Sequence, residues 1–149
     1  MNGYLIRLFE RSVLALMLFA AIGGMGIPKA AKAAAEGRIS LLADRLHQVR
    51  SSIALYRAEH HGRLPGRNGD GRADERAFLA DLTERNEKGQ AVYLGQMPAN
   101  PFLKGQAAFR VTVVDDPAAR PSGKEGTGWW YNAATGHFAA CDSRYHSAF

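Results

Sequence analysis

The sequence predicts an α+β protein in which a long N-terminal helix packs against a small antiparallel β-sheet. The first observation is an apolar stretch, Val13 to Ile27, that continues without a linker into residues with helical periodicity. The second is a stripe of apolar residues, three and four apart, that reaches Tyr56. The third is a set of short β-branched and aromatic runs in the last third of the chain. A sheet that follows a long helix is expected to cover its apolar stripe.

The helix is predicted to run from residue 13 to about residue 60 and to change character at Pro28. Residues 1–28 form a membrane and assembly helix in this interpretation, and residues 29–149 form the head. The head begins with an amphipathic stem helix over residues 29–61. The apolar stripe of the stem consists of Ile39, Leu42, Leu46, Val49, Ile53 and Tyr56. Four arginines lie off this stripe and are expected to face water: Arg38, Arg45, Arg50 and Arg57.

Turn residues separate the stem from the rest of the head. Gly62 is a suitable left-handed cap for the stem, and Pro65 follows it. Asp70 or Asp74 is expected to cap a second helix from about residue 73 to residue 85. The double-proline segment 97–102 is expected to brace the fold, with Phe102 and the nearby Tyr93 packed in the core.

Three strands are predicted after this brace, over residues 107–114, 129–133 and 138–141, with residues 91–94 as a shorter extended piece. A long flexible loop, residues 115–128, precedes the last two strands. Because side chains alternate along a strand, Trp129 and Tyr131 share one side and Trp130 takes the other. We expect one side to pack on the stem and the other to be exposed for contact with a neighbouring subunit.

The composition limits the function classes. The chain has 149 residues and a formal net charge of +5, but its basic residues are dispersed, so nucleic acid is a disfavoured partner. Cys141 is the single cysteine, which excludes an intrachain disulfide. The sequence contains no phosphate-binding glycine loop and no nucleophile elbow, so we predict that the protein is not an enzyme.

The N-terminal segment leaves two interpretations open. Arg7 and Arg11 precede the apolar stretch, as in a membrane anchor with a cytoplasmic N-terminus. The stretch is shorter than the roughly 20 residues of a typical spanning helix. The small residues Ala31 and Ala33 could alternatively mark a signal-peptidase site. Removal of residues 1–33 would then leave a soluble periplasmic binding module. Both interpretations place the head outside the cytoplasm.

Three segments together resemble the type IV pilin-like proteins, most closely the pseudopilins of type II secretion systems. These segments, in family order, are Leu46–Pro65 (LHQVRSSIALYRAEHHGRLP), Tyr93–Phe102 (YLGQMPANPF) and Gly128–Phe138 (GWWYNAATGHF). The resemblance implies a structural subunit of a filament that acts in protein export, with its helix in the inner membrane and its head in the periplasm. The implied partners are other pilin-like subunits, the inner membrane, and a secretion platform with its ATPase. A DNA-binding minor pilin is a further alternative within the same family.

The resemblance also implies a processing site and assembly residues, although the motif is degenerate. Family members are cut after a glycine and carry a glutamate at the fifth mature position. Gly3 is the only glycine before the apolar stretch, and the fifth residue after it is Leu8. Glu10 is the nearest acid, one residue before the position that the spacing from Pro28 implies. In the family this glutamate pairs with the N-terminal amine of a neighbour; a headgroup-region ion pair with Arg7 or Arg11 is the alternative.

One loop has the oxygen-rich composition of a weak calcium site. Its candidate ligands are Asn68, Asp70, Asp74 and Glu75, grouped around a glycine turn. The first and twelfth positions of a calcium loop fall on Gly66 and Ala77, which cannot supply the usual anchoring carboxylates. We therefore favour a polar loop that caps the second helix, and we predict no other metal or cofactor. The core residues predicted in the sheet are Trp129 and Tyr131.

Overall fold

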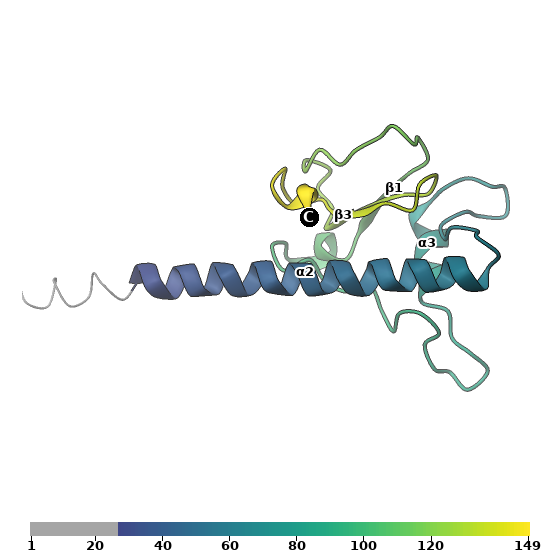
Figure 1. Ribbon diagram of the computed structural model, residues 1–149, viewed down its shortest axis with the longest axis horizontal. Coiled ribbons are helices and arrows are strands. Elements are labelled where there is room, and N and C mark those ends of the chain that lie inside the picture. Colours follow the sequence, from purple (N-terminus) through teal and green to yellow (C-terminus); the bar gives the residue numbers. More distant parts are fainter. Residues whose placement is uncertain (1–26) are drawn as a thin grey trace, which may run out of the picture. The chain divides into compact units, whose positions relative to one another are not determined.

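The computed structural model describes residues 27–149 and confirms the α+β class (Figure 1). Two compact units divide the chain, one ending at Ile39 and the other comprising Ser40–Phe149. The elements are helix α2 (Ile27–Glu59), helix α3 (Glu75–Leu82), and strands β1 (Val111–Val114), β2 (Trp129–Asn132) and β3 (Phe138–Ala140), with short 3-10 helices at Gly105–Ala108 and His146–Ala148. The helix expected over residues 13–26 lies outside the described residues. Between residues 27 and 149, no helix is both long and apolar enough to cross a membrane.

Helix α2 begins with residues that favour helix strongly and ends at a left-handed cap. Alanines dominate residues 30–35, and alanine has the highest helix propensity. Pro28 lies in the first turn, where its missing N–H costs no intrahelical bond. At the other end, the Gly62 N–H donates to the Arg57 carbonyl at 2.8 Å, and Gly62 has a φ of 88°. The glycine cap expected from the sequence is therefore present, while α2 itself ends at Glu59.

The apolar stripe of α2 is covered by the rest of the second unit. Leu42, Leu46, Val49, Ile53 and Tyr56 are each at most 5% exposed. Ile39, the first residue of the predicted stripe, is half-buried. The sheet lies along one side of the second-unit part of α2 (Figure 1). The core that they share includes Phe78, Leu82, Trp129, Tyr131 and Phe138.

Truncation of the stripe should destabilise the head far more than truncation of the opposite helix face. Ile53 is 5% exposed and Leu55 is 46% exposed. We expect Ile53→Ala to lower the free energy of unfolding by about 2–4 kcal/mol, because it leaves a cavity in a packed core. Leu55→Ala, the matched control two residues away, should cost less than about 1 kcal/mol. Thermal unfolding of both variants measures the difference, and equal melting temperatures would contradict the packing described here.

Helix α3 is shorter than the predicted span of residues 73–85. Asp74 caps it as expected, with its Oδ1 accepting from the Ala77 N–H at 2.7 Å. The helix ends at Leu82 because Thr83 turns the chain, and its hydroxyl donates to the Leu79 carbonyl at 2.7 Å. The chain then doubles back through one isolated bridge between Arg85 and Ala91. The extended piece expected at residues 91–94 is thereby reduced to that bridge.

The sheet is mixed, so the prediction of an antiparallel sheet is wrong for its first strand. Strand β1 pairs parallel to β2, with Val111 opposite Trp129, while β2 and β3 form the antiparallel hairpin expected from the sequence. A parallel pair needs a crossover of about a dozen residues or more, and residues 115–128 supply one. Strand β1 is also shorter than predicted, because residues 105–108 form a 3-10 helix before it.

This crossover segment is tied to the sheet and to the chain after it. The Asn132 Nδ2 donates to the Asp116 carbonyl at 2.7 Å, and the Cys141 Sγ donates to a Glu125 carboxylate oxygen at 2.9 Å. Trp130 is only 2% exposed, and the His137 ring lies edge-on to it at 5.6 Å. The expectation that one side of β2 is exposed is therefore wrong. A segment interpreted as a flexible loop is held at both ends by specific contacts.

Glu125 should make the stability of the head depend on acid pH. Burial alone would raise the pKa of Glu125, but hydrogen bonds from the Cys141 thiol and from backbone N–H groups outweigh it and lower the pKa from 4.5 to about 2. Because the unfolded chain binds this proton more readily, the stabilisation is complete above pH 4.5 and is lost as the pH falls towards 2.

We expect Glu125→Gln to flatten the fall in stability between pH 4.5 and pH 2, measured by urea unfolding at a series of pH values. Glu87→Gln, in an exposed loop, is the control and should leave the pH profile unchanged. A profile that Glu125→Gln leaves as steep as that of the parent protein would show that the carboxylate is not stabilised in this way.

Candidate functional site: the long helix and its contacts

Helix α2 changes from exposed to buried along its length. Residues 29–38 are all exposed, whereas the stripe that begins at Leu42 is buried. Residues 30–35 need no partner to remain helical, because a packed helix continues from them and nucleation is already provided. Lys32 and Glu36 add an exposed pair one turn apart, with 3.9 Å between their charged atoms. Among the described residues, the first part of α2 therefore presents uncovered helix.

The face of α2 away from the sheet carries two exposed leucines. Leu41 is 40% exposed and Leu55 is 46% exposed. They lie two heptads apart, so they share one side of the helix. A shallow groove of about 510 Å³ follows this side, and its lining includes Asp44, Ser51 and Tyr93. The combination of separated apolar residues and polar groups suits contact with another protein surface.

Two of the four arginines expected in water instead bind backbone carbonyls of the head. The Arg50 guanidinium donates to the Phe138 carbonyl at 2.8 and 3.0 Å and to the Phe149 carbonyl at 2.9 Å. Arg45 donates to the Ala99 carbonyl. Burial lowers the pKa of Arg50. Helical periodicity gives the direction of each Cα–Cβ bond and so placed these arginines off the buried stripe. The long arginine side chain can nevertheless extend back to backbone carbonyls at the edge of that stripe.

An aromatic cluster fixes the C-terminal end of α2. The Tyr56 ring stacks on His60 with 4.0 Å between centroids, and its edge contact with Tyr93 measures 5.3 Å. The Tyr93 hydroxyl donates to the Glu59 carboxylate at 2.8 Å. Burial and this hydrogen bond raise the pKa of Tyr93 to about 12. Tyr93, predicted as a core residue, is half-buried and joins the helix end to the segment before the proline loop.

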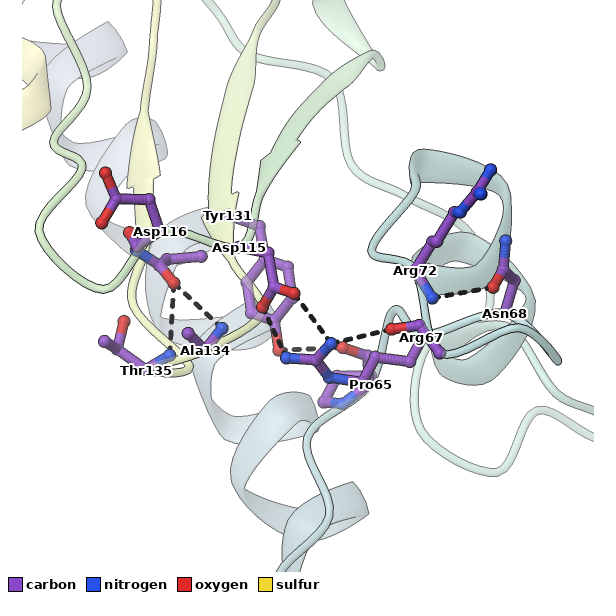
Figure 2. Close-up of polar contacts among 11 residues, drawn as sticks. Pro65, Arg67, Asn68, Arg72, Asp115, Asp116, Tyr131, Ala134 and Thr135 are labelled. Carbon is purple, nitrogen blue, oxygen red and sulfur yellow. Dashed lines mark hydrogen bonds and ion pairs between the residues drawn. The ribbon is translucent and has the colours of Figure 1, made fainter.

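The chain that follows α2 is fastened to the sheet by Tyr131 and Arg67. The Tyr131 hydroxyl donates to the Pro65 carbonyl at 3.0 Å, and burial raises the pKa of Tyr131. Figure 2 shows the Arg67 guanidinium facing the Asp115 carboxylate beside this phenol, with two hydrogen bonds of 2.8 and 2.5 Å. Tyr131 is fully buried, as its predicted core position requires. Its hydroxyl accordingly has a partner, as buried tyrosines usually do.

The proline loop is organised around Asn100, which the sequence reasoning missed. Asn100 is 1% exposed, and its Nδ2 donates to the Gly128 carbonyl at 2.8 Å and to the Asp142 carboxylate at 2.7 Å. Its Oδ1 accepts from the Phe102 N–H at 2.9 Å. Phe102 is only half-buried, and its ring lies tilted against that of His146 with 4.0 Å between centroids. The sequence signal that could have found Asn100 is its position between two prolines. An asparagine held in a rigid, buried loop must pair the polar atoms of its amide, so it is expected to make several hydrogen bonds.

Three of the four candidate calcium ligands, Asn68, Asp74 and Glu75, accept hydrogen bonds within the protein through their side-chain oxygens. The Asn68 Oδ1 accepts from the backbone N–H groups of Asp70 and Arg72, a contact partly drawn in Figure 2. Asp74 caps α3, and Glu75 accepts from Arg110 and the Val111 N–H. In the region from residue 27 onwards, no group of three or more His, Cys, Asp and Glu side chains could hold a metal ion. The helix cap that the sequence favoured for this loop is present at Asp74.

The candidate processing residue Gly3 and the candidate assembly residue Glu10 lie outside the described residues. Pro28 is placed in the first turn of α2. Comparisons of the chain with protein-family models, with curated proteins and with solved structures each found no match.

Proposed function

We propose that this chain is a structural, non-enzymatic subunit of a pilus-like filament, most similar to the pseudopilins of type II secretion systems. In this proposal the apolar residues before α2 anchor the chain in the inner membrane and the second unit is its periplasmic head. A secretion platform and its ATPase would lift subunits into a filament that exports protein. The chain itself would supply shape and contacts rather than chemistry.

The observation that carries this proposal is the change in exposure along a single helix. A soluble domain has little use for a helix whose residues 29–38 are exposed while its continuation is the backbone of the core. A filament subunit needs such a helix, because the uncovered part can pack against other subunits. The apolar sequence of residues 13–27 immediately precedes it. Helix α2 also runs without interruption through Ala31 and Ala33, which favours an uncut chain over the signal-peptide alternative.

The experiment tests whether the exposed face of α2 meets other copies of the chain. Leu41→Cys and Leu55→Cys, combined in one full-length chain, place two thiols on that face. The native Cys141 is buried and its pKa is raised to about 12, so it should remain unreactive at neutral pH. In membranes from a bacterial host that carries a secretion platform, a short bismaleimide should give a ladder of dimers, trimers and longer species.

The matched control is a chain with Lys88→Cys and Lys124→Cys, two exposed loop positions in the same unit. It should give a weaker ladder or none. An equal ladder from the control, or only monomers from the helix variant, would count against a filament built on α2. Intact mass of the mature chain separates the signal-peptide alternative, because a chain beginning after Ala33 would have lost the anchor.

A further inference from the structure

A second surface of the head is a groove between the last turns of α2 and the turn that joins β2 to β3. The groove has a volume of about 580 Å³ and lies wholly within the second unit. Ile53 and Leu64 contribute apolar surface to it, and Gly136 closes one end against Leu64. A Cβ at position 136 would lie 2.8 Å from a Leu64 methyl carbon, so the turn and the leucine already touch. This floor is apolar and preformed.

The ionisable side chains that line the groove in the described part of the chain are Arg50, Arg57 and His61. Arg50 is anchored by backbone carbonyls rather than by a carboxylate side chain. Arg57 is exposed, and within residues 27–149 no hydrogen bond or ion pair ties it to another side chain. The described lining of the groove therefore combines an apolar floor with basic side chains and includes no acidic side chain.

The histidine beside the groove, His137, is affected by the same positive charge. His137 lies in the turn beside the groove, and its pKa is lowered by burial and by the positive charges of Arg50 and Arg120. A cation in the last turn of a helix is often explained by the helix dipole, and Arg57 fits that explanation. The dipole does not explain Arg50, which lies more than two turns before the helix end.

We propose that this groove binds an acidic peptide segment of a partner protein, with one apolar side chain of the segment seated on Ile53 and Leu64. The planar guanidinium of Arg57 offers paired donors to a carboxylate, and Arg50 adds charge at the other side. Such a ligand needs both parts of the groove: the apolar floor for its apolar side chain and the arginines for its carboxylates.

Other occupants fit less well. Single-stranded nucleic acid is usually held by aromatic side chains on which bases stack, and among the described lining residues none is a tryptophan, tyrosine or phenylalanine. A second copy of the chain, with a net charge of +5, offers no excess of acidic groups to a basic groove. Peptide binding in this groove does not depend on filament formation, because every residue that lines the groove belongs to the second unit.

The test uses the full-length chain in non-ionic detergent and a fluorescein-labelled octapeptide of alternating aspartate and leucine. Binding is measured by fluorescence polarisation at low salt and at rising salt concentration. We expect saturable, salt-sensitive binding that weakens at least about tenfold in Arg57→Ala, since a charge-assisted hydrogen bond is lost. The control Arg76→Ala removes an exposed arginine from α3 and should change affinity less than twofold. Unchanged thermal unfolding of both variants shows that they are folded.

Three results would overturn the proposal. Equal losses in Arg57→Ala and Arg76→Ala would mean that only overall charge matters. Equal binding of a peptide with asparagine in place of aspartate would remove the requirement for an acid. Tighter, Arg57-dependent binding of an eight-nucleotide single-stranded DNA would assign the groove to nucleic acid instead.

Discussion

Replacing Asn100 by alanine is expected to lower the free energy of unfolding by about 2–4 kcal/mol, among the largest effects of any single change in the head. The amide of Asn100 satisfies the Gly128 carbonyl, the Asp142 carboxylate and the Phe102 N–H. The Gly128 carbonyl would still accept from the Cys141 N–H, and the Asp142 carboxylate would still pair with His146. The Phe102 N–H would lose its partner, and a buried group left without a partner costs about 1–3 kcal/mol. The loss therefore combines this penalty with three side-chain hydrogen bonds at a residue that is 1% exposed.

Asn68→Ala is the matched control, because the Asn68 side chain also makes three hydrogen bonds, with two backbone N–H groups and Asp74, but lies beside exposed loop residues, where water can replace it. It should cost about 1 kcal/mol or less. Asn100→Asp should be at least as harmful as Asn100→Ala, since it places an acceptor against the Gly128 carbonyl and Asp142. Urea unfolding of residues 29–149 measures all three. If Asn100→Ala and Asn68→Ala cost the same, Asn100 does not organise the proline loop.

Deletion of residues 1–28 is expected to move the protein from the membrane fraction to the soluble fraction while the head stays folded. The core of the head is formed by α2, α3 and the sheet, all of which lie after residue 28 apart from the first turn of α2. The deletion removes the apolar residues 13–27, the longest apolar run in the chain. Transfer of such a run out of lipid is strongly unfavourable, so the effect should be close to complete.

Sedimentation after cell fractionation, with circular dichroism of the soluble form, measures this change. The truncated head should remain in the supernatant, largely monomeric, with the helix and sheet content described above. The full-length chain should pellet with membranes or filaments. A full-length chain recovered at its complete mass in the soluble periplasmic fraction would refute the anchor and the filament together.

The buried face of α2 could be predicted from the sequence, because apolar residues three and four apart lie on one side of a helix. Leu42, Leu46 and Val49 have this spacing, and their side chains are buried. The Asp74 cap and the left-handed Gly62 were equally local signals. Each depends on residues within one or two turns, where a sequence carries most of its structural information.

The contacts that sequence reasoning missed join residues far apart in the chain. The parallel pairing of β1 with β2 depends on where residues 115–128 return, and their composition indicated only a loop. The partners of Asn100 include Asp142, 42 residues further along. Arg50 was assigned to water because its carbonyl partner, Phe138, is 88 residues away. The predicted alternation of side chains along β2 was right. Alternation alone does not show whether both sides of a strand are buried, and Trp130 is buried as well as Trp129 and Tyr131.

The bond between Arg50 and Phe138 has a consequence for the order of events during synthesis. The apolar stripe of α2 leaves the ribosome long before β2 and β3 exist, so only earlier core residues such as Phe78 and Leu82 can cover part of it until residues 129–140 have been made. Pairings this distant form slowly, because the intervening chain must first be closed into a loop. The nascent head therefore cannot complete its core until most of its residues have been translated.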